Sequence, residues 1–251
     1  MIIGHFHSGS GLGNQLARYI FTRVKADELG VPFGMTGFFK GDFIDIDLGE
    51  PVPIDLSKYK TFNEERVNTP DGVDIRPYDP KTRDIKDNTI VDGEFQDIKY
   101  FEHKIDELQG VLGTREIIMW DNVCVINFRG GEYVGIKDLF LPQEYWDKAI
   151  EEIRALHRDI KFEVHTDDEV TARQFFPNFV IKTGMDINWR SVRYAHYLIL
   201  SNSSFGIVPA LLNVKAKKII APKYWAGYNV GYWKLPQNQY EKFTYIHHLE
   251  I

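Results

Sequence analysis

Short apolar runs alternate with amphipathic segments along much of the chain. At the N-terminus, an apolar run over residues 1–6 leads into a glycine-containing loop, and a segment with apolar residues at three- and four-residue spacing follows. That spacing is typical of a helix with one apolar face, and Gly30 provides a stop signal after it. The apolar positions of the segment are Leu16, Tyr19, Ile20 and Val24. The pattern predicts a strand, a loop and a helix at the start of the chain.

The second half of the chain alternates more regularly. From residue 122 onwards, apolar runs are separated by segments with helical periodicity. Strands and helices that alternate at this pace form a parallel sheet with right-handed crossovers. We predict strands over 122–128, 160–166, 178–184, 198–202 and 216–222, and helices over 142–157, 168–176, 187–197 and 205–213. The fold class is therefore α/β.

The region between these parts is irregular. Residues 34–92 are polar and rich in Pro and Asp, which indicates loops with short strands. A strand is predicted to end near Gly93, and a helix is predicted to begin beyond Phe95. One face of that helix would consist of Tyr100, Phe101, Ile105 and Leu108.

The chain is long enough for one large or two small domains. It has 251 residues, of which 43% are hydrophobic and 14% aromatic, so it can bury a sizeable core. We predict an N-terminal domain over 1–118 and a C-terminal domain over 119–251, with a C-terminal segment that could cross back onto the first domain.

Charge, cysteine content and hydropathy limit the partners. The net charge of −6 argues against broad nucleic-acid binding, and Cys124 alone supports neither a disulfide framework nor a thiolate zinc cluster. No run approaches the roughly 20 apolar residues of a membrane span, and a signal peptide is not evident. We expect a cytoplasmic protein without a transmembrane segment.

The glycine-rich loop at the N-terminus fits the common phosphate-binding motifs badly. Gly13 is followed by Asn14 and Gln15, whereas a Walker loop needs Lys and then Ser or Thr. A dinucleotide fingerprint needs a third glycine and a later acidic residue, and neither is in place. From the residues alone, a plain tight turn is as good an interpretation as a ligand-binding loop around Gly11 and Gly13.

Three stretches follow predicted strands of the second half and so should lie at the same edge of its sheet, where ligands bind. Arg129 could neutralise a diphosphate, or could be an ordinary surface arginine. Asp167 and Asp168 could bind a ribose or base, or could cap the next helix. The third stretch could hold phosphate oxygens or cap its helix, and it comprises Ser203, Ser204 and Phe205.

Several of these stretches occur together, and in the same order, in one enzyme family. The stretches "GSGLGNQLARYIF", "DGEFQDIKYF", "VINFRGGEYVG", "LPQEYWDKAI", "VHTDD", "SNSSF" and "APKYW" resemble the bacterial alpha-1,2-fucosyltransferase family. The resemblance extends along most of the chain. It implies a GT-B architecture, with two Rossmann-like domains facing each other across a cleft. It also implies inverting transfer of fucose from GDP-fucose to a saccharide acceptor, with no metal or other cofactor required.

The resemblance also implies roles for individual residues. Arg129 matches an arginine that contacts the donor's diphosphate, and Asp167 and Asp168 match a stretch near the nucleoside. We also count His165, two residues earlier, among the substrate-binding candidates. The phosphates would lie by Ser203, Ser204 and Phe205. The loop of Gly11, Gly13, Asn14 and Gln15 would lie across the cleft. At two positions the chain departs from the family, because Asn127 replaces a histidine and Glu132 replaces an aspartate.

The sequence therefore predicts a fucosyltransferase in which Arg129 stabilises the leaving GDP. Glu132, or a histidine of the first half, would remove the acceptor proton. One alternative is a catalytically inert protein that binds a sugar nucleotide or glycan, because Asn127 cannot carry a proton. A second is a transferase of another sugar that uses a metal held by Asp45 and Asp47. The acceptor, the linkage and the oligomeric state are not predicted.

Overall fold

The computed structural model describes residues 1–68, 74–224 and 240–246. The chain divides into two compact units, Met1–Gly113 and Thr114–Ile251. The sequence placed this boundary after residue 118. Both units contain a parallel sheet with helices, so the predicted α/β class is confirmed.

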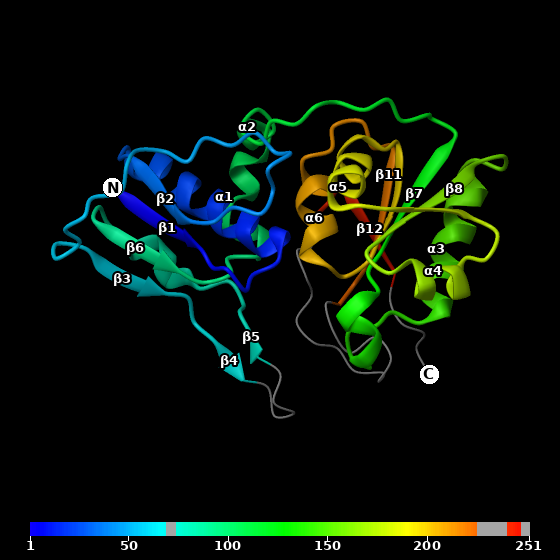
Figure 1. The fold of residues 1–251 in the computed structure, drawn as a ribbon, viewed down its shortest axis with the longest axis horizontal. Helices are drawn as coiled ribbons and strands as arrows, with labels where there is room; N and C mark the ends of the chain where they lie inside the picture. The colour runs from blue at the N-terminus through cyan, green and yellow to red at the C-terminus, as the bar shows by residue number, and fades with distance from the viewer. Residues whose placement is uncertain (69–73, 225–239, 247–251) are drawn as a thin grey trace. The chain divides into compact units, whose positions relative to one another are not determined.

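The first unit is built on a four-stranded parallel sheet with the order β2-β1-β6-β3. Helix α1 packs against β1 and β2 (Figure 1). A separate antiparallel pair joins β4 and β5. The elements are β1 (Ile2–Phe6), α1 (Leu12–Leu29), β2 (Phe33–Gly37), β3 (Lys60–Asn63), β4 (Val67–Asn68), β5 (Asp74–Ile75), η1 (Pro80–Asp84) and β6 (Thr89–Asp92).

The predicted strand, loop and helix at the N-terminus are confirmed. Helix α1 begins one residue after Gly11, so Gly13 lies in its first turn and not in the loop. Gly30 ends the helix in the left-handed conformation, with φ of 64°, and its amide donates to the carbonyls of Ala26 and Asp27. Glycine adopts this conformation without the steric cost that a Cβ imposes.

The single helix predicted beyond Phe95 is wrong. In its place lie three short pieces: η2 (Ile98–Tyr100), η3 (Glu102–Lys104) and α2 (Ile105–Leu108). The four residues expected on one face are all buried, so the apolar pattern was correct. Two contacts favour tight turns: the Asp97 side chain accepts from the amide of Lys99, and the Tyr100 hydroxyl donates to buried Glu64 at 2.9 Å.

The second unit holds a six-stranded sheet with the order β12-β11-β10-β7-β8-β9, and all its strand pairs are parallel. Its predicted strands and helices are confirmed. They are β7 (Val123–Phe128), α3 (Gln143–Leu156), β8 (Lys161–Thr166), α4 (Glu169–Phe175), β9 (Val180–Thr183), α5 (Met185–Tyr194), β10 (Tyr197–Leu200), α6 (Ser204–Leu211) and β11 (Lys218–Pro222). The short helix η4 (Gly131–Gly135) after β7 was not predicted.

The strand β12 (Phe243–Ile246) comes from the aromatic-rich C-terminal segment and pairs with β11. The described part of that segment thus extends the sheet of the second unit. The rest of the segment, 225–239 and 247–251, lies outside the described residues.

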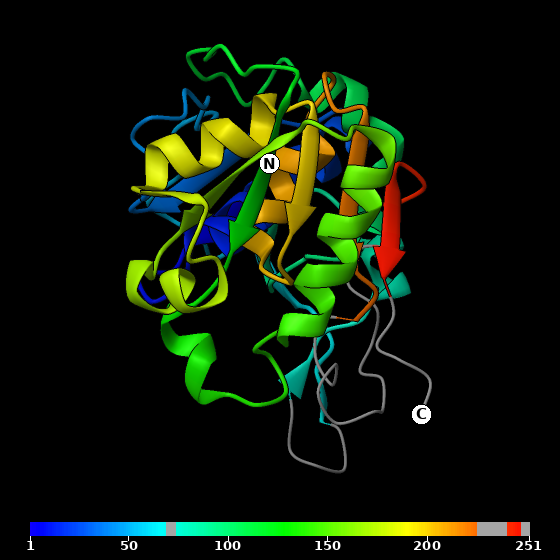
Figure 2. The same ribbon diagram turned by 90° about the vertical axis from the view of Figure 1, so that its right-hand side faces the viewer.

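The two faces of the second sheet differ in what covers them. Alternate β7 residues Cys124, Ile126 and Phe128 join an apolar cluster with α3 and α4. Right-handed connections that run in opposite directions along a sheet put their helices on opposite faces, and α3 and α6 do so here (Figure 2). The β7 residues that alternate with Cys124, Ile126 and Phe128, including Asn127, therefore face the α6 side. Among the described residues, no helix has the length and apolar character that crossing a membrane requires.

Candidate functional site

The second sheet reverses its direction of growth between β7 and β10. From β7 the chain passes through α3 to the neighbour β8, whereas from β10 it passes through α6 to β11 on the opposite side. The loops that follow β7, β8 and β10 therefore meet at one edge. Open parallel sheets bind ligands in the crevice that this reversal creates outside the carboxyl ends of the strands. The three stretches singled out from the sequence are these loops.

Arg129 follows β7 and is held by both neighbouring carboxylates. Its Nη1 donates to Oδ2 of Asp167 at 2.5 Å, and its Nη2 donates to Oε1 of Glu132 at 2.9 Å. The guanidinium also lies over the ring of Tyr133, with Cζ 5.2 Å from the ring centroid. The Glu132 side chain remains 72% exposed. Arg129 is thus oriented from three sides, while its partner Glu132 is accessible to solvent.

Asp167 and Asp168 tie the β8 loop to the β7 loop. Asp167 accepts from the Gly130 amide at 3.0 Å through Oδ1, and Asp168 accepts from the Gly131 amide at 3.2 Å through Oδ2. Asp168 also caps α4, because Thr171 donates to it through its amide at 3.0 Å and its hydroxyl at 2.6 Å. These hydrogen bonds from Thr171 hold the pKa of Asp168 below its ordinary value. The capping role expected for the pair therefore belongs to Asp168 alone.

The contacts of Asp167 and Asp168 with the β7 loop require glycine at positions 130 and 131. A Cβ on Gly130 would lie 2.6 Å from the Cβ of Asp168, and a Cβ on Gly131 would lie 2.7 Å from Oδ2 of Asp167. Gly131 also has φ of 47°, a conformation that L side chains rarely adopt. The glycines let the backbone approach the two aspartates closely.

Ser203 is the N-cap of α6. Its Oγ accepts from the Phe205 amide at 3.4 Å, and its carbonyl accepts from the Gly206 amide at 3.0 Å. Ser203 is buried, whereas Ser204 and Phe205 are half-buried in the first turn of the helix. An α6 N-terminus at the crevice between β7 and β10 offers the partial positive charge that favours an anion there.

Asn127 stands where the resembling family has histidine, and it is buried. Its Oδ1 accepts from the Ser201 hydroxyl at 3.3 Å, and its side chain packs on the Cα of Gly206. A Cβ on Gly206 would lie only 2.2 Å from Asn127 Oδ1. Asn127 therefore joins β7 to the start of α6 and is positioned beneath the crevice.

His165 lies deeper still, within β8. Its Nδ1 is 3.2 Å from Oδ1 of Asn188 on α5, and its Nε2 is 3.6 Å from Oε2 of Glu163. The ring of His165, together with the Lys182 ammonium 2.7 Å from Glu163, lowers the pKa of Glu163 to about 2. Because His165 is fully buried, it supports the β8 loop from below and presents no ring atom to solvent.

The predicted residues of the N-terminal loop have structural contacts within the first unit. Gln15 is buried, and its side chain bonds to the carbonyls of His7 and Phe38 and to the Lys40 amide. Asn14 accepts from the Gln96 side chain at 2.9 Å. Gly11 precedes α1 in an exposed position with open space around its Cα, and Gly13 is buried in the helix.

Sequence reasoning missed Arg18 in the same motif. Arg18 is 1% exposed, and its guanidinium donates to the carbonyls of Gly93 at 2.6 Å and His5 at 3.0 Å. Burial lowers the pKa of Arg18 from its ordinary value, and the nearby Glu94 carboxylate opposes that effect. The sequence carried one signal for this role of Arg18, a stripe of polar residues at helical spacing on an otherwise apolar helix face. The stripe consists of Gln15, Arg18 and Thr22, and all three are buried.

The described residues contain no group of three or more His, Cys, Asp or Glu that could hold a metal ion. Asp47, one of the two aspartates considered for a metal, lies 3.4 Å from the Arg23 guanidinium and accepts from the Gly49 amide. Those contacts are typical of a surface turn.

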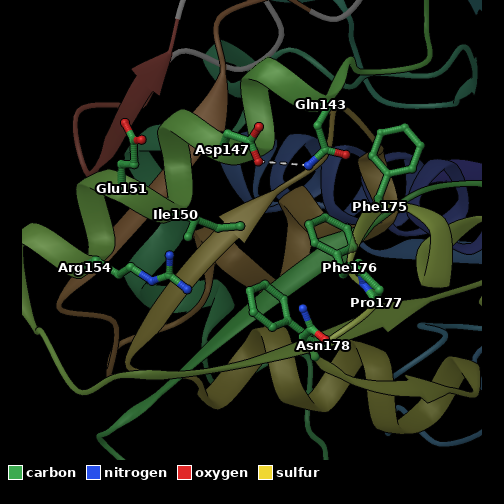
Figure 3. Close-up of a pocket in the computed structure, with 10 residues that line it drawn as sticks. Gln143, Asp147, Ile150, Glu151, Arg154, Phe175, Phe176, Pro177 and Asn178 are labelled. Carbon is green, nitrogen blue, oxygen red and sulfur yellow. Dashed lines mark hydrogen bonds between the residues drawn. The ribbon is translucent and has the colours of Figure 1, made fainter.

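A pocket of about 370 Å³ lies between α3 and the turn after α4 (Figure 3). On the α3 wall, Gln143 donates to Asp147 one turn further along the helix, at 2.9 Å. The aromatic rings on its other wall belong to the cluster around Phe128. Its lining consists of Gln143, Asp147, Ile150, Glu151, Arg154, Phe175, Phe176, Pro177, Asn178 and Phe179. This groove lies on a helical face and shares no lining residue with the loops at the sheet edge.

Comparison with known proteins finds distant likeness among solved structures. No family model and no curated protein sequence matches the chain. Among solved structures, the chain is similar to the crystal structure of NodZ alpha-1,6-fucosyltransferase soaked with GDP-fucose. The TM-score is 0.47, the identity is 14%, and the match covers 95% of this chain and 99% of that one. A likeness of this extent identifies neither donor nor acceptor for this chain.

Proposed function

We propose that this chain is an inverting glycosyltransferase that moves fucose from GDP-fucose to a hydroxyl of a saccharide acceptor. The observation that carries the proposal is the loop junction at the β7–β10 crevice, where Arg129, Asp167 and Ser203 come from three different loops. Each of these residues also matches a family motif in the sequence. The finer assignment, to alpha-1,2 transfer, rests on that motif resemblance alone.

Arg129 would bind the diphosphate of the donor. A guanidinium is always charged and presents a fixed fork of donors, which suits phosphate oxygens. Within 129–135 and 165–168, Arg129 is the single permanent cation beside three carboxylates, so anion binding at these loops depends on it. The amide end of α6 would add its partial charge on the other side of the crevice.

Asp167 and Asp168 would lie near the nucleoside, where carboxylates accept hydrogen bonds from ribose hydroxyls or from guanine N–H groups. Asp168 would keep its role as the N-cap of α4. Asp167 is therefore the better candidate for direct contact with the nucleoside. When the diphosphate arrives, it would replace Asp167 as a partner of Arg129.

The reaction would be one in-line displacement. An acceptor oxygen attacks the anomeric carbon, the bond from that carbon to the diphosphate breaks, and the configuration inverts. GDP leaves with the bonding electrons, and Arg129 stabilises the charge that develops on it. In the free protein Glu132 pairs with Arg129, and we propose that it orients this arginine during catalysis.

A direct test is transfer assayed with GDP-fucose and a panel of saccharide acceptors, in the presence of chelator. The proposal expects GDP release that depends on acceptor and that Arg129→Ala abolishes. The inert-protein alternative is favoured by one observation, the burial of Asn127 where a histidine would stand. Tight GDP binding without turnover on any acceptor would establish that alternative.

A further inference from the structure

The buried side chain of Asn188, on α5, holds the end of β8. Asn188 is 5% exposed, and its Nδ2 donates to the carbonyl of Thr166 at 3.0 Å. Thr166 is the last residue of β8 and is itself 1% exposed. The next residue in the chain is Asp167, which pairs with Arg129. Asn188 therefore binds the peptide group that leads into the loop junction at the β7–β10 crevice.

The contacts of the Asn188 amide fix its orientation. A carbonyl only accepts hydrogen bonds, so the amide nitrogen faces Thr166 and Oδ1 faces His165. His165 Nδ1, which lies 3.2 Å from that oxygen, is therefore the donor. An amide turned the other way would place its oxygen against the Thr166 carbonyl in a buried position, where an unpaired polar group is costly. The amide therefore has one stable orientation.

The other side of the His165 ring is also held. Its Nε2 lies 3.6 Å from Oε2 of Glu163, and the Lys182 ammonium lies 2.7 Å from the same oxygen. His165 is fully buried, so its ring is confined by these contacts. A chain of polar contacts thus runs from Lys182 on β9 through Glu163 and His165 to Asn188.

The Thr166 carbonyl orients the residue that follows it. A peptide group is planar, so a hydrogen bond to the Thr166 carbonyl also fixes the direction of the Asp167 amide. On the other side of Asp167, the Asp168 amide donates to the Thr166 hydroxyl at 2.9 Å. Both peptide groups of Asp167 are therefore held, and its carboxylate is directed at Gly130 and Arg129.

We propose that Asn188 is a positioning residue of the diphosphate site, because its amide sets the direction in which Asp167 holds Arg129. Asn188 is buried beneath the loops and acts on the arginine through Thr166 and Asp167. The inference rests on the proposed function, which supplies the diphosphate that Arg129 binds. It predicts that loss of the Asn188 amide changes the affinity for GDP and not only the stability of the second unit.

Asn213 offers a matched control, because it anchors the other end of the same helix. It is 0% exposed, and its Nδ2 donates to the carbonyls of Val192 at 2.8 Å and Ala195 at 2.9 Å. Its Oδ1 accepts from two backbone amides. Removal of either asparagine side chain leaves buried backbone groups without a partner and costs stability. Of the two, Asn188 alone bonds to the strand end that leads into Asp167.

The test is titration calorimetry of the full chain with GDP, at a temperature where circular dichroism shows every variant to be folded. We expect Asn188→Ala to weaken GDP binding by roughly 5- to 50-fold, the scale of one lost buried hydrogen bond. Asn213→Ala should bind GDP within about twofold of wild type. Equal GDP affinities of these two variants would overturn the inference.

A double-mutant cycle shows whether Asn188 acts through Arg129. In the Arg129→Ala background, Asn188→Ala should weaken GDP binding little further, because both changes remove the same contact with the diphosphate. If Asn188→Ala weakens GDP binding by the same factor with and without Arg129, Asn188 does not position the arginine.

A further measurement needs neither a variant nor a nucleotide. Imidazole ¹⁵N shifts report which ring nitrogen carries a proton, and the inference expects a proton on His165 Nδ1 in the wild-type protein. An unprotonated Nδ1 would mean that the oxygen of Asn188 does not face His165. That result would contradict the role of Asn188 even if Asn188→Ala does not fold.

Backbone resonances separate this inference from the donor assignment. Asn188→Ala should shift the amide signals of Asp167 and Gly130 in the nucleotide-free full chain, while Asn213→Ala leaves both unmoved. If neither signal moves in Asn188→Ala, the inference fails even when GDP binds. If the wild-type protein does not bind GDP, the proposed function fails, and the same resonances decide whether Asn188 positions Asp167.

Discussion

Asp167 bonds to the β7 loop through both of its oxygens, with Oδ2 2.5 Å from Arg129 Nη1 and Oδ1 3.0 Å from the amide of Gly130. The cation expected to bind a diphosphate is thus already paired in the free protein. The pair is about one-third exposed, and pairs of this kind contribute on the order of 0–1 kcal/mol to stability. A diphosphate that carries more charge than one carboxylate can displace Asp167 at little cost.

Arg129→Ala should weaken GDP binding by roughly 10- to 150-fold, which corresponds to the loss of charged hydrogen bonds. Arg129→Lys should give an intermediate loss, because it keeps the charge and removes the fork. Titration calorimetry measures both. Arg173→Ala is the matched control, since Arg173 pairs with Glu169 on the exposed side of α4. If the Arg129→Ala and Arg173→Ala proteins bind GDP equally well, Arg129 does not bind the diphosphate.

Asp168→Ala should lower the free energy of unfolding by about 0.5–2 kcal/mol, because α4 loses its N-cap. Asp168→Ser should recover most of that stability, since serine also caps helices. Urea denaturation of the two variants provides the comparison. A serine variant that is no more stable than the alanine variant would show that the cap contributes little and that the bond to Gly131 dominates.

Gly206→Ala should destabilise the second unit by about 1–3 kcal/mol, the usual cost of overpacking a filled site. The added Cβ would lie 2.2 Å from Asn127 Oδ1. Shortening the neighbour in the double variant Asn127→Ala, Gly206→Ala should recover part of the loss, and a double-mutant cycle measures this coupling. Strict additivity of the two single changes would contradict the contact.

Glu163 should make the second unit sensitive to acid. Its pKa in the folded protein is about 2, against an ordinary value of 4.5, so its carboxylate stabilises the fold above pH 4.5. That contribution is lost as the pH falls from 4.5 towards 2. Glu163→Gln should therefore be destabilising at pH 7 and much less so near pH 2, as judged by urea unfolding at both values. A difference from wild type that is independent of pH would contradict the pairing with His165 and Lys182.

The regular second half was predictable because each strand and helix has its own hydrophobic period. The order of its strands was not, since it depends on which way each connection crosses the sheet. The loops after β7, β8 and β10 were identified as candidates because they follow strands, but their mutual contacts appear only in the fold. Asn127 shows the limit: the sequence places it in a motif, but only the fold shows that its side chain is buried and turned towards Gly206.

The first half was harder for a different reason. Its elements are held by long-range polar contacts, such as those of Arg18 with Gly93 and of Glu64 with Phe95. No local period encodes such pairs. The prediction of one helix after Phe95 was wrong for this reason, because the Tyr100 side chain points into the core and its hydroxyl donates to Glu64.

The most direct test of the central claim is titration calorimetry of the full chain with GDP, GDP-fucose, GDP-mannose and UDP-glucose, each with and without chelator. The account predicts that GDP and GDP-fucose bind selectively, that chelator leaves their affinity unchanged, and that Arg129→Ala weakens both. Equal affinity for UDP-glucose and GDP-fucose, or no nucleotide binding at all, would contradict the assignment of the β7–β10 crevice as a GDP-fucose site.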